Sequence, residues 1–129
     1  MMKRIPVIFL VLLTFMACLG RHPEEKAAKA AKACYDLLLE GRYADFVAQT
    51  ADADSLPEVY REQLEANIKM FVGQMQREHR GIKEVRIANC TADSSGRAAN
   101  AFLVLCFGDS TVEETVVPMV ERDGKWLMR

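Results

Sequence analysis

The spacing of apolar residues changes at Ile82, and this change limits the fold more than any other feature of the chain. Up to Gly81 the apolar residues recur every three or four positions, as they do in amphipathic helices. From Ile82 onward they alternate with polar residues, and β-branched side chains become frequent, as in strands. Helices followed by an antiparallel sheet predict an α+β domain.

Two helices are expected before residue 51. Pro23 suits the first turn of a helix, and the spacing predicts a helix over 24–40 that stops at Gly41. A second, short helix is expected over 43–50. The core-facing side of the first helix is expected to carry small and apolar residues, namely Ala27, Ala30, Ala31, Cys34, Leu37 and Leu38.

A third and longer helix is expected to run from the region of Ser55 to Arg80. Ser55 and Glu58 have the spacing of a capping box, and Pro57 lies between them. The apolar seam of this helix is expected to be Tyr60, Leu64, Ile68, Phe71 and Met75. Within a concave domain four of these residues would line a pocket: Tyr60, Leu64, Phe71 and Met75.

The second half of the chain predicts a four-stranded antiparallel meander. Its strands are expected over 85–91, 97–107, 111–120 and 125–128, separated by short turns rich in Gly, Asp and Ser. Pro118 has no amide hydrogen to donate, so it predicts a sheet edge or a bulge near the end of the third strand.

The start of the chain has the pattern of a signal peptide that ends in a lipid attachment site. Lys3 and Arg4 precede an apolar run over 5–16, and Ala17 supplies a small residue before Cys18. The run is shorter than the ~20 apolar residues that a membrane-spanning helix needs. Simple secretion and an uncleaved anchor are the alternatives.

The sequence Phe15-Met16-Ala17-Cys18 resembles the lipobox of bacterial lipoproteins. This resemblance implies a signal peptide over 1–17, a lipidated tether over 18–23 and a folded domain over 24–129. Leu19, in place of an acidic residue after Cys18, implies the outer membrane of the cell envelope, with the domain in the periplasm or at the surface. The expected partner is therefore the membrane, through the lipid on Cys18.

The charge balance argues against a nucleic-acid partner. Loss of Lys3 and Arg4 with the signal peptide leaves 15 of the 17 basic residues against 18 acidic ones, a formal charge of −3. The basic residues that remain are scattered and form no block that could follow a phosphate backbone.

Two short motifs resemble the nuclear transport factor 2-like, or cystatin-like, superfamily. Leu38-Leu39-Glu40-Gly41-Arg42-Tyr43, followed by Phe46, is similar to the junction between the first two helices of that family. Asp123-Gly124-Lys125-Trp126, followed by Leu127, is similar to its closing hairpin. The resemblance implies a long helix enclosed by a curved sheet in a cone. The particular resemblance is to small bacterial lipoprotein members that have no assigned function.

No residue is assigned a catalytic role from the sequence. Enzymes of the family carry an acid or base inside the cone, for which the candidates here are His79, Tyr60, Asp36 and Asp45. His79 falls near the exposed end of the long helix, and the two aspartates fall on polar faces, so each has a simpler structural explanation. No metal and no cofactor are expected.

The cysteines of the domain are expected to be free thiols. Cys34, Cys90 and Cys106 are isolated in sequence, without the spacing of a metal site. A turn at residues 94–96 would place Cys90 opposite residues 99–101, about 15 Å from Cys106 along the strand, so we expect no bond between these two. A link from Cys34 to one of them stays open.

The apolar run over 101–107 would present apolar side chains on both faces of the sheet. One face is expected to pack on the helices, and the other is expected to be covered by a second copy or by a partner protein. Proteins of the resembled superfamily often dimerise through their sheets. The alternative is a curved sheet shielded by its own long side chains.

These features predict a lipid-anchored module that binds a small apolar ligand or assembles with another protein. An enzyme with an acid/base site inside the cone, such as an isomerase or dehydratase, and a purely structural partner of an envelope protein are the alternatives. Convergence of Tyr60 with a carboxylate or with His79 in one pocket would favour the enzyme.

Overall fold

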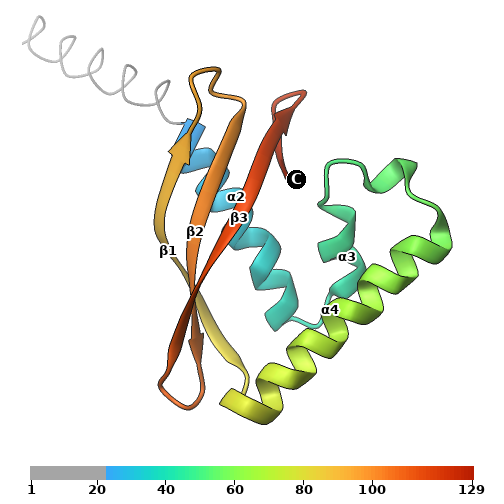
Figure 1. Ribbon diagram of the computed structural model, residues 1–129, viewed down its shortest axis with the longest axis vertical. Coiled ribbons are helices and arrows are strands. Elements are labelled where there is room, and N and C mark those ends of the chain that lie inside the picture. The colour runs from blue at the N-terminus through green and yellow to red at the C-terminus, as the bar shows by residue number, and fades with distance from the viewer. Residues whose placement is uncertain (1–22) are drawn as a thin grey trace, which may run out of the picture.

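The computed structural model describes residues 23–129, so the expected signal peptide and Cys18 lie outside the described residues. The first part of this range is helical, as the spacing predicts (Figure 1). The helices are α2 (Pro23–Leu39), α3 (Tyr43–Ala48) and α4 (Glu58–His79), with a 3₁₀ turn η1 (Ala53–Ser55) before α4.

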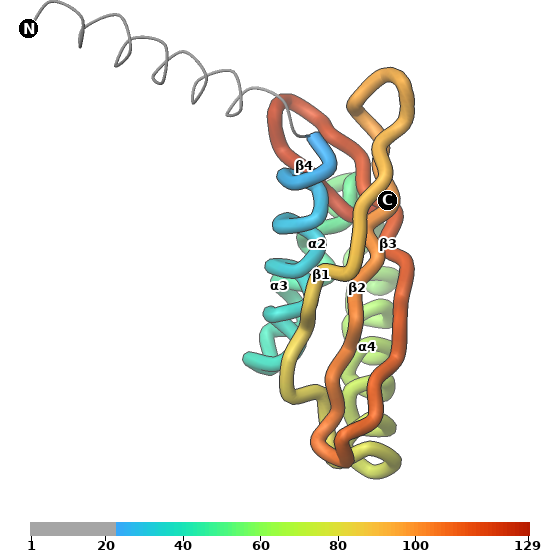
Figure 2. Tube along the Cα trace, turned by 90° about the vertical axis from the view of Figure 1, so that its left-hand side faces the viewer, coloured from blue at the N-terminus to red at the C-terminus, as the bar shows by residue number. Residues whose placement is uncertain are grey.

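The second part is a four-stranded antiparallel sheet with the order β1-β2-β3-β4, which confirms the meander. Figure 2 shows α2 alongside the sheet, next to β1. Buried residues of both α2 and α4 join the core on the inner face of the sheet. The domain is therefore α+β, with one layer of helices on one sheet face. The strands are β1 (Ile82–Ala92), β2 (Ala98–Phe107), β3 (Val112–Arg122) and β4 (Lys125–Met128).

Two irregularities in the pairing of β1 with β2 bend the sheet, and Pro118 lies where the pairing of β3 with β4 ends. The pairing of β1 with β2 shifts twice, between Ile82 and Glu84 and between Ile87 and Asn89, and such bulges bend a strand and increase its twist. Pro118 pairs with β2 in regular register. Pairing of β3 with β4 begins only at Met119, so Pro118 occupies an edge position, as expected.

The core lies between α2 and the inner face of the sheet. Alternate residues of β2 are buried, including Leu103 and Leu105, which are at most 2% exposed. The small residues Ala27 and Ala31 of α2 are fully buried and allow the helix to approach the sheet closely. The core also includes Cys34, Leu38, Phe46, Val85, Val117, Met119, Trp126 and Met128.

Helix α4 packs less closely than α2. Of its 22 residues only Met75 is buried, and Leu64, Ile68 and Phe71 are half-buried against the core. Tyr60 is 53% exposed, so the prediction that it belongs to the inner seam is wrong. The first turns of α4 extend away from the sheet (Figure 1). The apolar residues in these turns therefore have no sheet surface to pack against.

The capping box predicted at Ser55 and Glu58 is also wrong. Ser55 ends the 3₁₀ turn, and its hydroxyl donates to the carbonyl of Asp52 at 2.9 Å instead of to α4. The residue before α4 is Pro57, whose side chain makes no capping hydrogen bond. The hydroxyl that was expected to cap α4 is therefore bonded within the 3₁₀ turn η1.

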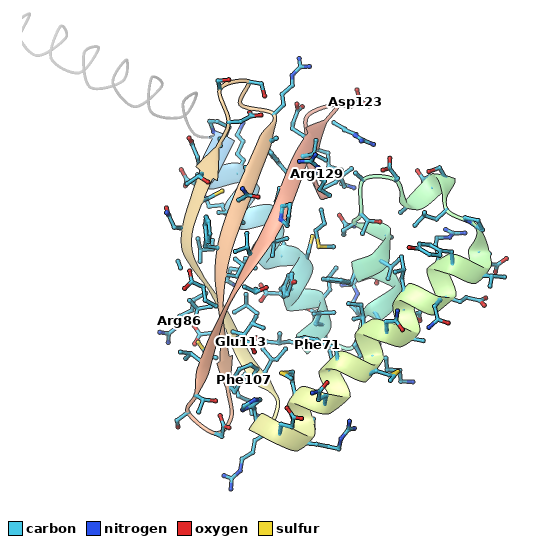
Figure 3. All side chains as sticks on the ribbon, in the orientation of Figure 1. Phe71, Arg86, Phe107, Glu113, Asp123 and Arg129 are labelled. Carbon is cyan, nitrogen blue, oxygen red and sulfur yellow. The ribbon has the colours of Figure 1, made fainter. Side chains whose placement is uncertain are left out.

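His79 at the end of α4 fastens this helix to the β2–β3 turn. Its Nδ1 lies 3.0 Å from Oδ2 of Asp109, and its ring stacks on Phe107 with ring centroids 4.6 Å apart. The amide of Gly108 donates to the carbonyl of Gly81 at 2.9 Å, so the two backbones also meet. Figure 3 shows Phe107 beside the last turn of α4. A structural role for His79, as expected, accounts for these contacts.

The carboxylate of Asp109 makes this junction sensitive to acid. Hydrogen bonds from the hydroxyl and amide of Thr111, and then the contact with His79, lower its pKa from 3.8 to about 2. A lowered pKa adds stability that is fully present above about pH 4 and is lost as the pH falls toward 2.

We therefore expect D109N to be less stable than the unaltered chain at pH 7. We also expect its unfolding free energy to fall less steeply between pH 4 and pH 2. Urea unfolding at a series of pH values measures both effects. Parallel pH profiles for the two proteins would show that the Asp109 carboxylate does not stabilise the junction.

Candidate functional site

A groove of about 610 Å³ lies between α2 and the β3–β4 hairpin. Small-molecule sites commonly occupy about 300–1,000 Å³ and are lined mainly by apolar groups. The groove is lined by Lys26, Lys29, Ala30, Ala33, Cys34, Leu37, Gln49, Gly124, Lys125 and Trp126.

One wall of the groove is held in place by the segment that follows α3. The amide of Ala51 donates to the carbonyl of Met128 at 2.7 Å, and the amide of Met128 donates to the carbonyl of Gln49 at 2.9 Å. These bonds form an isolated parallel bridge beside β4. Arg122 adds a 2.7 Å bond from Nη1 to Oδ1 of Asp52. The short strand β4, which carries Trp126, is thereby supported on both sides.

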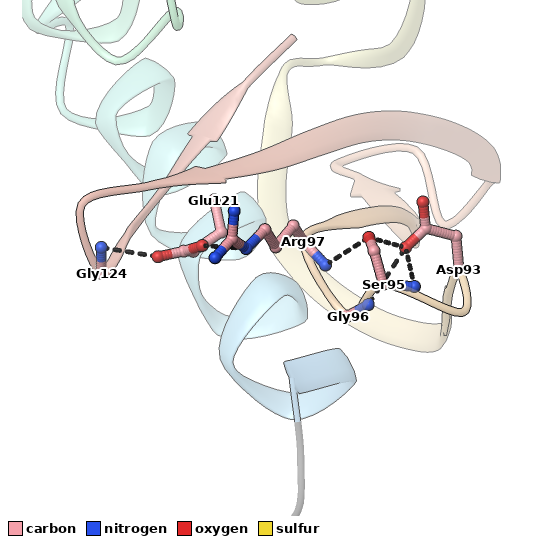
Figure 4. A network of polar contacts seen from close by, with 6 residues as sticks. All are labelled: Asp93, Ser95, Gly96, Arg97, Glu121 and Gly124. Atoms are coloured by element: carbon pink, nitrogen blue, oxygen red, sulfur yellow. Dashed lines mark hydrogen bonds and ion pairs between the residues drawn. The ribbon is translucent and has the colours of Figure 1, made fainter.

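The turn at the mouth of the groove is held by a polar network (Figure 4). Glu121 accepts a 2.6 Å hydrogen bond from the amide of Gly124, and its other oxygen lies 3.9 Å from Nε of Arg97. In the neighbouring turn, Asp93 accepts bonds from the amides of Ser95 and Gly96 at 3.1 Å. The backbone next to Lys125 therefore has a defined position.

The floor of the groove is apolar, and its one thiol is not activated. Trp126 is 8% exposed and Cys34 is 4% exposed. Burial raises the pKa of the Cys34 thiol to about 11, and the positive charge of Lys125 lowers it by a smaller amount. The thiol is protonated at neutral pH and acts as a small apolar group, not as a nucleophile.

A search of solved structures finds a similar fold in a protein of Campylobacter jejuni described as an NTF2-like transpeptidase. The two structures superpose with a TM-score of 0.62, over 76% of this chain and 92% of that one. The fold is nuclear transport factor 2-like. The aligned sequences are 16% identical, so the similarity concerns the fold alone. No family model matches the sequence, and no curated protein matches it.

The concave side of this nuclear transport factor 2-like fold carries polar groups that the sequence analysis did not select. Burial raises the pKa of the Tyr35 phenol on α2, and Thr115 of β3 lowers it by a smaller amount. The phenol therefore stays protonated at neutral pH and can donate a hydrogen bond. Glu113 shares this face, because it pairs with the buried Leu105 (Figure 3). Helical spacing from Ala31 to Leu38 would have placed Tyr35 on the inner side.

The catalytic candidates weighed from the sequence do not come together. Tyr60 and His79 are 19 residues apart on one straight helix, which places them about 28 Å apart. Asp36 is paired with Lys32 at 2.7 Å, and Asp45 is paired with Arg42 at 2.8 Å, both toward the surface. The convergence that would have favoured an enzyme is not found for these residues.

The three cysteines of residues 23–129 are free thiols. Cys90 pairs with Ala101 and Cys106 pairs with Glu84, which confirms the expected separation along the sheet. A link from Cys34 to either strand cysteine, which the sequence left open, is not formed.

Two further properties concern the described residues only. No group of three His, Cys, Asp or Glu side chains in the range 23–129 is arranged to hold a metal ion. None of the helices in this range is both long and apolar enough to span a bilayer.

Proposed function

We propose that this chain is a lipid-anchored envelope protein whose nuclear transport factor 2-like domain binds a small ligand in the groove between α2 and β4. The groove itself is the observation that carries the proposal, because its volume and its apolar floor suit a small molecule. The pocket expected along Tyr60, Leu64, Phe71 and Met75 is less suitable, since Tyr60 is 53% exposed. Ligand binding on this face leaves the outer face of the sheet available for assembly.

Peptidyl transfer, the activity in the name of the Campylobacter jejuni protein, is not our proposal for this chain. Acyl transfer to a protein side chain needs an activated nucleophile. The thiol in the groove has a pKa of about 11, raised by burial, and it remains protonated.

Blocking the groove tests the proposal. Ala33 is exposed and lines the groove, so a phenyl ring in A33F would occupy part of its volume. We expect native mass spectrometry of the full chain, purified from its own cells, to show a bound small molecule that A33F loses. The matched control is A66F, which changes an exposed alanine in the middle of α4. Retention of the molecule by A33F would place its site elsewhere.

The lipid anchor is proposed from the resemblance of residues 15–18 to a lipobox. We expect C18S to lose incorporation of labelled palmitate and to move from the membrane fraction to the soluble fraction. C106S is the control, because Cys106 is a free thiol in the domain. Equal labelling of C18S and the unaltered chain would contradict the anchor.

We also propose that a second copy covers the outer face of the sheet. The outer face of β2 and β3 carries exposed apolar side chains, of which Val112 is 64% exposed and Val116 is 51% exposed, on either side of Glu114. Exposed apolar surfaces of this kind commonly mark contacts between proteins. Further apolar residues of this face are Phe102, Val104, Cys106, Pro118 and Val120.

A second negative charge, next to Glu114 in the centre of that surface, would prevent the dimer. We expect the full chain to have the mass of a dimer and V116E to have the mass of a monomer, measured by light scattering after size exclusion. V59E is the control, because Val59 is 78% exposed on α4, away from the sheet. A monomer in the unaltered chain would instead support the alternative of a self-shielded curved sheet.

A further inference from the structure

The charges around the groove indicate which class of ligand it takes. Three of the residues that line it are lysines, and none is an aspartate or a glutamate. The expected mature chain has more acidic than basic residues, so the lining differs in charge from the chain as a whole. The carboxylates that contact lining residues are Glu25, paired with Lys29, and Glu121, which accepts a hydrogen bond from the amide of Gly124. Because like charges repel and opposite charges attract, the groove favours an anion over a cation of the same size.

The three lysines differ in how far their charge is already neutralised. Lys29 is 3.1 Å from Glu25, one helical turn earlier. Lys26 and Lys125 have no ion pair within residues 23–129, although Lys32, on the same helix as Lys26, is paired with Asp36. Lys125 lines the groove from the β4 side, and its positive charge lowers the pKa of the Cys34 thiol by less than burial raises it. Lys26 and Lys125 are thus the two ammonium groups free to meet a ligand.

The α2 wall of the groove is also polarised along its length, whereas Lys125 faces this wall from β4. Lys26 and Lys29 come from the first turns of α2, and Leu37 comes from its last turns, about 16 Å further along the helix. Ala30, Ala33 and Cys34 lie between them and contribute only apolar surface and a protonated thiol. A ligand that matches this arrangement has a negative group at one end and an elongated apolar body.

We infer that the groove binds a free amphipathic anion, a medium-chain carboxylate of the fatty-acid type. Its carboxylate lies between Lys26 and Lys125, and its chain extends past Ala33 toward Leu37 and Trp126. This inference depends on the proposed function, because it names the ligand class of the same groove. It adds that the ligand carries a negative charge, a property that the apolar floor of the groove does not require.

Trp126 makes the inference directly measurable, because it is the only tryptophan of the chain and it lines the groove. Bromine quenches indole fluorescence on contact. The probes are 10-bromodecanoate and its neutral counterpart 10-bromodecan-1-ol, added to the full chain in phosphatidylcholine vesicles. We expect the carboxylate to quench Trp126 at concentrations about tenfold lower than the alcohol does, the size of effect expected for a charge-assisted hydrogen bond.

Substitutions of the lysines separate the effect of their charge on binding from the effect of the groove's shape. We expect K26Q combined with K125Q to remove the preference for the carboxylate and to leave quenching by the alcohol unchanged. The matched control is K32Q, since Lys32 does not line the groove and is paired with Asp36. The combination of K26R and K125R keeps both charges and is expected to keep the preference.

The outcomes distinguish the inference from the function on which it depends. Equal quenching by both probes, or a preference that survives the loss of both lysines, would overturn the anionic class while the groove remained a binding site. Quenching by neither probe would overturn the groove as a binding site altogether. Unfolding midpoints of all variants show whether each one is folded.

Discussion

The close packing of α2 on the inner face of the sheet is the contact on which the other parts of the domain depend. Ala27 and Ala31 are fully buried, and their small side chains let the helix backbone approach β1 and β2. A larger residue at either position would push α2 outward, and overpacking of this kind typically costs about 1–3 kcal/mol. The same displacement would move Lys26 and Ala33 relative to Trp126, so the geometry of the groove depends on the alanines behind it.

Most of the fold could be predicted from local patterns, because helices and strands bury apolar residues with different periods. Gly41 and Gly81 mark helix ends with positive φ angles of 74° and 86°, conformations that glycine adopts without strain. Pro118 correctly indicated an edge, since a residue without an amide hydrogen cannot donate to a neighbouring strand. These features depend on nearby residues, which is why sequence reasoning could locate them.

The candidate site could not be predicted in the same way, because its walls come from distant parts of the chain. Lys26 and Trp126 lie near opposite ends of the domain's sequence but line the same groove. The bridge between Thr50 and Met128 sets the position of β4. The errors have a related cause. The spacing that includes Tyr60 is correct for an amphipathic helix, but only the packing shows that α4 leaves the sheet before that turn. The hydroxyl of Ser55 likewise forms its hydrogen bond within the 3₁₀ turn η1, which the spacing of apolar residues does not reveal.

The uneven burial of the two long helices implies that the domain opens in parts. Helix α4 has one buried residue in 22, and its last turn is fastened to the β2–β3 turn by His79 and Asp109. Cooperative units with few buried contacts open at a lower free energy than the core, and their amide hydrogens exchange with solvent sooner. The amides in the first turns of α4 should therefore exchange well before those of β2. The groove, built on α2 and β4, would keep its shape through such openings.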